Sequence, residues 1–190
     1  MGKLKFLTLF LIIISIAGLT SWLLRTLSDE DKEYKTASKY EADYFLEDFV
    51  ATAIDAKGKP SYRLEAKELK HFPVSTLVTL QKPYIEFYTD QTKPWQTWAE
   101  HGIVHETDQR MILTGKVRIH RAGEKNETAI TLLTDSLTID TRSKLAETED
   151  DVDIQRGSDN ISATGMRIDM LNDRLELLSK VQGKYEVPAK

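Results

Sequence analysis

The sequence predicts an all-β domain of antiparallel strands that follows one N-terminal transmembrane helix. Three observations support this fold class. Residues 6–24 carry no charge. Downstream, short segments alternate apolar and polar residues, which is typical of strands with one buried and one solvated face. A pattern of apolar segment, polar turn and apolar segment also occurs three times, which favours stacked two-strand units.

The uncharged run from Phe6 to Leu24 has 19 residues. A helix of that length spans roughly 29 Å, about one bilayer core. Lys3 and Lys5 precede the run, whereas the residues soon after Arg25 are acidic. This asymmetry predicts that residues 1–5 stay in the cytoplasm and that the rest of the chain is exported.

A cleaved signal peptide is the alternative interpretation of this run. Ser15 and Ala17 are small residues at a separation that suits cleavage, but Leu19 and Trp22 continue the apolar run beyond them. A retained, single-pass anchor is therefore favoured. Residues 25–41 are charged and lack periodicity, so they are predicted to form a linker to a domain at 42–190.

The segments with a two-residue period are predicted to be half-buried strands. Turn-forming residues separate them at intervals that suit short antiparallel connections, and no long soluble helix is evident. Stacking such units gives a sandwich, a jelly roll or a solenoid-like trough. The alternating apolar positions are Tyr62, Leu64 and Ala66; Ile85 and Phe87; Val117 and Ile119; Leu137 and Ile139; Val152 and Ile154; Met166, Ile168 and Met170; and Leu175 and Leu177.

The three copies of the repeated pattern are anchored at Ile103, Leu137 and Met166. The first two anchors are 34 residues apart and the next two are 29 apart. In each copy a polar turn separates the two apolar segments: residues 106–110 in the first, 140–144 in the second, and the region of Asn172 and Asp173 in the third.

Charge and composition exclude several functions. The net charge is −4, and removing the three cations of the first 25 residues leaves 23 basic and 30 acidic residues, or −7. Such an acidic domain disfavours a nucleic-acid partner. The chain has no cysteine, so it has neither disulfides nor thiolate metal sites.

No pattern predicts an enzyme, a cofactor or a metal site. The sequence has no Gly-x-Ser-x-Gly elbow and no phosphate-binding glycine loop. His101 and His105 are four residues apart, but without a helix they are interpreted as solvated strand residues. The acidic stretch from Glu147 to Asp153 lacks the spacing of a calcium loop and is predicted to be a solvated turn.

Four segments, taken in order along nearly the whole chain, resemble one family. They are Gly58 to Leu64, Lys82 to Phe87, Trp98 through Arg110 and Met111 to Val117, and Lys180 to Glu186. Together with the anchor and linker, they resemble the LptC family of lipopolysaccharide export proteins of Gram-negative bacteria. The resemblance implies a periplasmic β-jelly-roll with an open, trough-like interior, held to the bacterial inner membrane by residues 6–24.

The resemblance also implies partners and a transport function. LptB, an ATPase, works with the membrane proteins LptF and LptG to extract lipopolysaccharide, and LptA forms the periplasmic bridge. The chain is expected to be a carrier and docking module, not an enzyme. A sheltered path is needed because exposing one 12-carbon acyl chain to water costs on the order of 9 kcal/mol, at about 0.8 kcal/mol per CH₂.

The candidate lipid-binding residues combine inward strand phase with a position in a family-like segment. Any inward Val or Ile is also a candidate core residue, so both roles remain open for each position. These candidates are Leu80, Ile85, Phe87, Val117, Ile119, Ile139, Ile168, Leu175 and Tyr185.

The last strand is predicted to present an unpaired edge to LptA, and the edge near residues 44–62 is predicted to meet the β domain of LptF. Gly58 and Gly165 are expected to adopt tight backbone conformations. The rival hypothesis is a membrane-anchored scaffold or adhesion domain with a closed core and no lipid cargo. The residues of the predicted docking edge are Leu175, Leu177, Val181, Tyr185 and Val187.

Overall fold

The computed structural model describes residues 19–21, 41–89, 93–105, 107, 109–123 and 128–184. The chain divides into two units, residues 1–41 and 42–190. None of the described residues belongs to a helix that is long and apolar enough to cross a membrane. The predicted transmembrane helix and linker lie outside the described residues, apart from residues 19–21 and 41.

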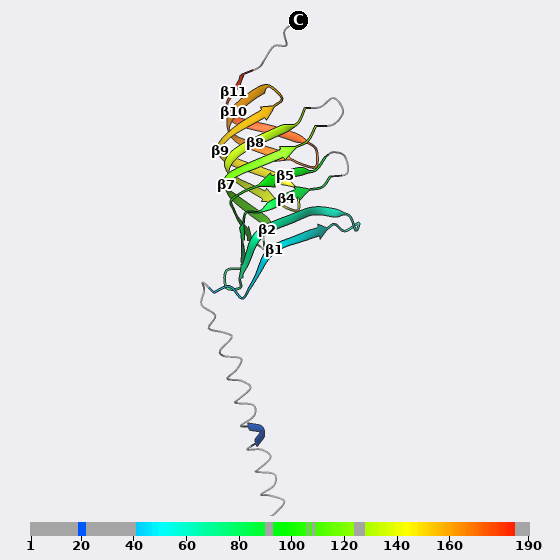
Figure 1. The fold of residues 1–190 in the computed structure, drawn as a ribbon, viewed down its shortest axis with the longest axis vertical. Coiled ribbons are helices and arrows are strands. Elements are labelled where there is room, and N and C mark those ends of the chain that lie inside the picture. The colour runs from blue at the N-terminus through cyan, green and yellow to red at the C-terminus, as the bar shows by residue number, and fades with distance from the viewer. Residues whose placement is uncertain are drawn as a thin grey trace, which may run out of the picture. The chain divides into compact units, whose positions relative to one another are not determined.

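The described part of residues 42–190 is an antiparallel sheet of 11 strands (Figure 1), which confirms the all-β fold class. The strands are β1 (Tyr44–Ile54), β2 (Pro60–Phe72), β3 (Leu77–Gln81), β4 (Tyr84–Phe87), β5 (Trp95–Trp98), β6 (His101–His105), β7 (Arg110–Arg121), β8 (Ile130–Asp140), β9 (Leu145–Arg156), β10 (Asp159–Asp169) and β11 (Arg174–Lys184).

Four short strands, β3 to β6, take the places of two long strands in the sheet: β3 and β4 both pair with β2, and β5 and β6 both pair with β7. Along one side of the sheet the order is β11-β10-β9-β8-β7-β5-β4-β2, with β1 beside β2. On the other side, β3 and β6 bridge β2 and β7 in place of β4 and β5. The backbone bonds from Lys82 N to Glu100 O (2.9 Å) and from Glu100 N to Gly115 O (3.0 Å) continue the sheet across the two breaks.

The long strands bend near their middles. Backbone φ is positive at Asp48 in β1, Lys116 in β7, Gly165 in β10 and Lys180 in β11. The pairing register shifts at the bends of β7 and β10. Bulges of this kind bend a strand and increase its twist. Because the bends fall side by side, they fold one sheet into two halves.

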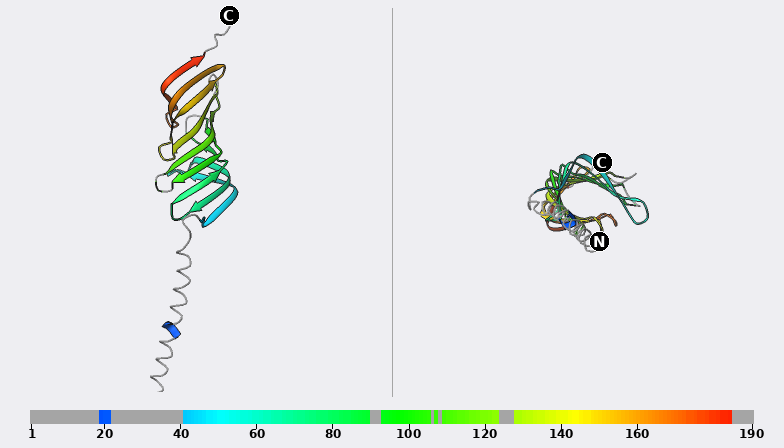
Figure 2. Two further views of the ribbon diagram at one scale, coloured as in Figure 1. Left: turned by 90° about the vertical axis from the view of Figure 1, so that its left-hand side faces the viewer. Right: turned by 90° about the horizontal axis from the view of Figure 1, so that it is seen from below.

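We call these halves the loop leaf and the turn leaf. Strands of the loop leaf end at the β1–β2, β4–β5, β7–β8 and β9–β10 connections. Strands of the turn leaf end at the β2–β3, β6–β7, β8–β9 and β10–β11 connections. The sheet curves round on itself (Figure 2, right), and buried apolar side chains of both leaves form one core cluster.

The turns of the turn leaf share one backbone conformation. Their last residues, Thr76, Gln109, Lys144 and Asp173, have φ of 50°, 54°, 55° and 54°. Three of these turns lie inside the repeated sequence pattern, whose copies are the hairpins β6–β7, β8–β9 and β10–β11. The repeat is therefore a stack of hairpins, as the sequence indicates.

Hydrogen bonds join three of these turns, β6–β7, β8–β9 and β10–β11, into a rim. Thr141 N donates to Gln109 O at 3.0 Å, and Met170 N donates to Lys144 O at 3.1 Å. Within its turn, Asp140 accepts the backbone N–H of Ser143 at 2.8 Å. That bond lowers the pKa of the Asp140 carboxyl, so the side chain stays ionised and closes the turn.

Two expectations about the strands are wrong. The acidic stretch is not a turn but part of β9, because Ala146, Thr148 and Val152 alternate with the charges and are buried. Met170 lies in the turn after β10, although its side chain is buried. Residues 44–54 form a full strand without clear alternation, since apolar residues occur on both of its faces.

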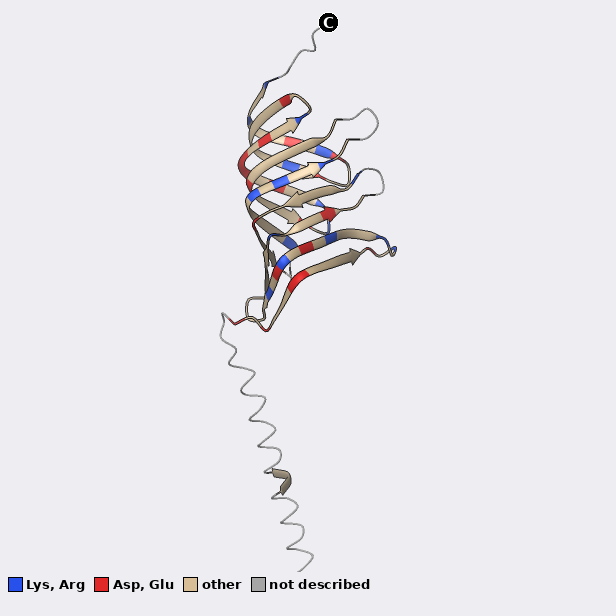
Figure 3. Ribbon diagram, viewed as in Figure 1, with Lys and Arg blue, Asp and Glu red and all other residues tan. Residues whose placement is uncertain are grey.

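Charged residues of both signs are spread along the strands of the sheet (Figure 3). In β7 the buried residues alternate with exposed or half-buried ones, among them Arg118 and His120. The polar positions therefore cover the outer face of each leaf, and the apolar positions fill the interior.

Candidate functional site

The interior between the leaves holds seven of the nine predicted lipid-binding residues. They come from β3, β4, β7, β8 and β10, and all belong to one core cluster. None is more than 2% exposed. In this structure they pack on one another as a closed core. The seven are Leu80, Ile85, Phe87, Val117, Ile119, Ile139 and Ile168.

Other interior residues are just as buried but were not among the predicted candidates. Leu132 has a clear physical reason for being missed. Leu133 follows it directly, so neither residue stands out as the inward one in the sequence. The structure turns Leu132 inward with 0% exposure and leaves Leu133 50% exposed. The others include Met111, Leu113, Leu137, Met166 and Met170.

A groove of about 560 Å³ opens between the two leaves near β1. Ala53 and Tyr62 line it from the loop leaf, and Val104 and Met111 line it from the turn leaf. The Tyr62 ring lies 5.6 Å from that of Phe87, and burial raises the pKa of the Tyr62 hydroxyl. Because Met111 of the core cluster lines it, this groove reaches the apolar interior. In the sequence, only the inward phase of Tyr62 indicates it.

We call the gap between the rims of the two leaves the mouth. Polar contacts between described residues cross it. Lys144 Nζ donates to the backbone oxygen of Tyr88 at 2.5 Å. Arg121, at the end of β7, pairs with Asp173 of the β10–β11 turn, and the two side chains are 14% and 28% exposed. Because each contact joins one leaf to the other, spreading the leaves requires both contacts to break.

Three polar atoms in the interior have no hydrogen-bond partner among the described residues. They are Trp95 Nε1, Thr97 Oγ1 and Thr134 Oγ1. Thr97 is 0% exposed and Thr134 is 6% exposed. Thr97 lies between Ile85 and Ile119 in the sheet, so its strand neighbours offer no polar side chain.

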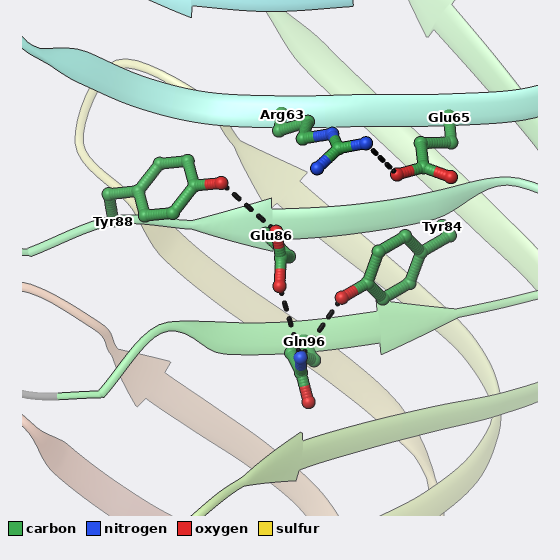
Figure 4. A network of polar contacts seen from close by, with 6 residues as sticks. All are labelled: Arg63, Glu65, Tyr84, Glu86, Tyr88 and Gln96. Atoms are coloured by element: carbon green, nitrogen blue, oxygen red, sulfur yellow. Dashed lines mark hydrogen bonds and ion pairs between the residues drawn. The ribbon is translucent and has the colours of Figure 1, made fainter. Parts of the chain in front are cut away.

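A hydrogen-bonded network covers the outer face of the loop leaf (Figure 4). Gln96 Nε2 donates to Glu86 at 3.1 Å and to the Tyr84 hydroxyl at 3.0 Å. The Tyr88 hydroxyl donates to the other Glu86 oxygen at 3.0 Å. Burial raises the pKa of Glu86, but hydrogen bonds from Tyr84, Gln96 and Tyr88 outweigh it, so the net pKa is lowered.

The two outermost strands pair on one side only within the described part of the chain: β1 with β2, and β11 with β10. Their free edges carry backbone donors and acceptors that can pair with another strand. Exposed large apolar side chains gather on these same strands. On β1 they are Tyr44, Phe45, Leu46, Val50 and Ile54, and on β11 they are Leu178 and Val181.

The predicted docking residues lie in or after β11. Leu175 and Leu177 are half-buried, pair with Ile168 and Met166, and pack against the core cluster. Val181 is exposed. Tyr185 and Val187 lie outside the described residues. The structure thus brings Leu175 to the rim of the interior and leaves Val181 at the surface.

Gly58 and Gly165 both have positive φ, 80° and 78°. A β-carbon added at Gly58 would meet nothing within 4 Å, whereas one at Gly165 would lie 3.0 Å from Leu178 Cδ1 of β11. Gly58 is therefore needed for its turn alone. Gly165 also allows close approach of the last strand.

His101 and His105 lie at the two ends of β6. Four residues of strand separate their backbones by about 13 Å. Within the described ranges, no group of three His, Cys, Asp or Glu side chains is arranged to hold a metal ion.

The geometry defines a class of protein: a folded β-sheet, or jelly roll, with an apolar interior and a mouth along one side. At each end lies an edge strand whose outer side has no partner strand among the described residues. The LptC-related lipopolysaccharide-assembly family model matches residues 10–186. The chain therefore belongs to the LptC-related family, and membership implies a role in lipopolysaccharide transport.

A solved structure supports the fold. LptH of Pseudomonas aeruginosa, described as the LptA-homologous periplasmic component of the lipopolysaccharide transport device, matches with a TM-score of 0.51 and 4% sequence identity. The match covers 66% of this chain and 95% of that chain. A comparison with curated proteins found no match to the sequence.

Proposed function

We propose that this chain is a periplasmic carrier that accepts lipopolysaccharide from the LptB, LptF and LptG transporter and passes it to LptA. Residues 6–24 anchor it in the inner membrane, residues 25–41 are its linker, and the β domain shelters the acyl chains. The observation that carries this proposal is the apolar interior between two leaves that are joined along the bends and face each other across a mouth. A rigid scaffold has no need for such an opening.

The acyl chains are proposed to enter through the mouth and displace contacts among the interior side chains. The groove at Tyr62 and Met111 gives access from the β1 end, where lipid arrives. Leu175, at the rim near β11, is proposed to lie at the exit end, and Tyr185 is proposed to contact the acyl chains. The sugar head group stays outside in water, because the outer faces of the leaves are polar.

The two edge strands are proposed to dock the neighbouring proteins. The free edge of β11 adds a strand of LptA, and the free edge of β1 meets the β domain of LptF. Edge pairing of this kind continues the sheet and aligns the interiors. The exposed apolar side chains of both strands become buried in these contacts.

Direct binding tests the carrier role. The full chain in detergent, mixed with excess lipopolysaccharide, is expected to give a complex with one lipid molecule per chain in native mass spectrometry. A folded chain that remains free of lipid under these conditions contradicts the proposal and supports the closed-core scaffold.

Charge substitutions at the edges test docking. Leu178→Arg with Val181→Arg is expected to abolish capture of LptA while LptF and LptG still co-purify. Val50→Arg with Ile54→Arg is expected to have the opposite result. Each pair is the control for the other, and loss of both partners in both pairs contradicts separate docking edges.

A further inference from the structure

The interior is not uniformly apolar. Trp95 Nε1, Thr97 Oγ1 and Thr134 Oγ1 are buried in the apolar interior and have no hydrogen-bond partner among the described residues. Trp95 and Thr97 are two residues apart on β5, so they share the inward face at a spacing of about 7 Å. Thr134 faces the same interior from β8 and pairs with Val117.

Buried polar groups without a hydrogen-bond partner destabilise a closed apolar core. A buried hydroxyl without a partner destabilises the folded state, whereas valine has the same shape and no hydroxyl to desolvate. A bound water needs two to four polar partners, and the strand neighbours of Thr97 are Ile85 and Ile119. The threonines therefore fit an interior that receives something polar.

Thr148 is a matched inward threonine whose hydroxyl does have a hydrogen-bond partner. Thr148 is also inward and 6% exposed, but its Oγ1 accepts the backbone N–H of Asp150 at 3.1 Å. Thr148 is thus a core threonine that is satisfied within the protein. The contrast separates a threonine with a structural hydrogen bond from two whose hydroxyls have none.

We propose that Trp95, Thr97 and Thr134 form a polar track that hydrogen-bonds the hydroxyl and ester groups of bound acyl chains. The inference rests on the proposed carrier function and adds a specificity: chains with an oxygen near the head group bind more tightly than plain hydrocarbon chains of equal length. Trp95 supplies a donor, and each threonine supplies a donor and an acceptor.

The position of the track fits this role. Trp95 pairs with Phe87 and lies under Arg121, the residue that contacts Asp173 across the mouth. Thr97 lies one step deeper along the same strand. A chain that enters at the mouth therefore brings its polar head end against Trp95 and Thr97, while its hydrocarbon continues between the leaves.

Binding of two fatty acids tests the track. The full chain, held in amphipol, is loaded with an environment-sensitive fluorescent fatty acid, and 3-hydroxytetradecanoic acid or tetradecanoic acid is added as competitor. Wild type is expected to prefer the hydroxylated acid about tenfold, the effect of one added hydrogen bond. Thr97→Val with Thr134→Val is expected to remove this preference, and Thr148→Val is expected to keep it.

Thermal unfolding of the same variants supplies the second readout. Thr97→Val with Thr134→Val is expected to raise the melting temperature of the lipid-free chain, and Thr148→Val is expected to lower it. Equal binding of the two acids by wild type overturns the polar track but leaves the carrier function standing. A preference that survives in the double variant, or a lower melting temperature for it, also overturns the track. Lipopolysaccharide is added as a third competitor. If neither acid nor lipopolysaccharide displaces the fluorescent fatty acid, the carrier function itself fails.

Discussion

Strand β7 and strand β1 have similar lengths but different surroundings. In β7, Met111, Leu113, Val117 and Ile119 alternate inward and are almost completely buried. In β1 no residue is fully buried, and Val50 is 55% exposed. A central strand has neighbours on both sides and a leaf opposite, so its apolar residues stabilise the fold. An edge strand leaves apolar surface available for a partner.

The largest expected effect on the free energy of unfolding distinguishes the interior of the sheet from its edge strand β1. Phe87→Ala removes a fully buried ring and is expected to lower the free energy of unfolding by about 3–5 kcal/mol. Phe45→Ala, on β1, is expected to change it by about 0.5 kcal/mol or less. Urea unfolding of the full chain, followed by tryptophan fluorescence, measures both. Equal effects would show that the interior is no better packed than the edge.

The next largest effect on the free energy of unfolding is expected at Gly165, where β10 contacts the edge strand β11. Gly165→Ala is expected to cost about 1–2 kcal/mol because an L-residue is strained at positive φ, and its β-carbon also crowds Leu178. Gly58→Ala has the same backbone strain without a neighbour and is the control. Only Gly165→Ala is expected to increase amide hydrogen exchange in β11. Unchanged exchange there argues against a role for Gly165 in seating the last strand.

A smaller effect on the free energy of unfolding is expected in the hydrogen-bonded network around Glu86 on the outer face of the loop leaf. Glu86→Gln is expected to cost about 1 kcal/mol at neutral pH through weaker hydrogen bonds. Because folding lowers the pKa of Glu86, this contribution is complete above the unfolded pKa of about 4.3 and is lost as pH falls through the folded pKa. Unfolding curves of both proteins are therefore expected to converge at acid pH. A constant difference down to the acid limit would exclude Glu86 ionisation as its source.

The smallest effect on stability is expected at the mouth. Lys144→Met removes the contact with the Tyr88 backbone and is expected to change the free energy of unfolding by about 1 kcal/mol or less, while lipopolysaccharide uptake becomes faster. Lys116→Met is the control, because Lys116 is 86% exposed and pairs with Glu100 away from the mouth. Stopped-flow uptake rates compare the two. A slower rate for Lys144→Met contradicts a closing role.

The central strands could be predicted from the sequence because their environment matches the alternation. Val117 and Ile119 have polar neighbours, and a two-residue period is enough to place both inward. The same reasoning failed in β1, where Phe45 and Leu46 are adjacent and exposed on opposite faces. It also failed in β9, where a run of charges hid the inward Thr148.

The mouth could not be predicted, because it depends on contacts between distant residues. Lys144 and Tyr88 are 56 positions apart and meet only after the sheet folds at its bends. The bends themselves occur partly at Lys116 and Lys180, and lysine is a residue type that gives no sign of positive φ. Thr97 and Thr148 also look alike in the sequence, because the backbone bond from Asp150 that satisfies Thr148 depends on the local course of β9.

Site-specific photocrosslinking tests most directly whether lipid passes between the leaves. p-Benzoylphenylalanine in place of Tyr62 faces the interior groove, and in place of Tyr84 it faces the outer network, so two tyrosines of adjacent strands form a matched pair. During ATP-driven extraction by LptB, LptF and LptG, position 62 is expected to form a lipopolysaccharide adduct and position 84 none. An assembled complex with no adduct at 62, or with equal adducts at both positions, contradicts transport through the interior.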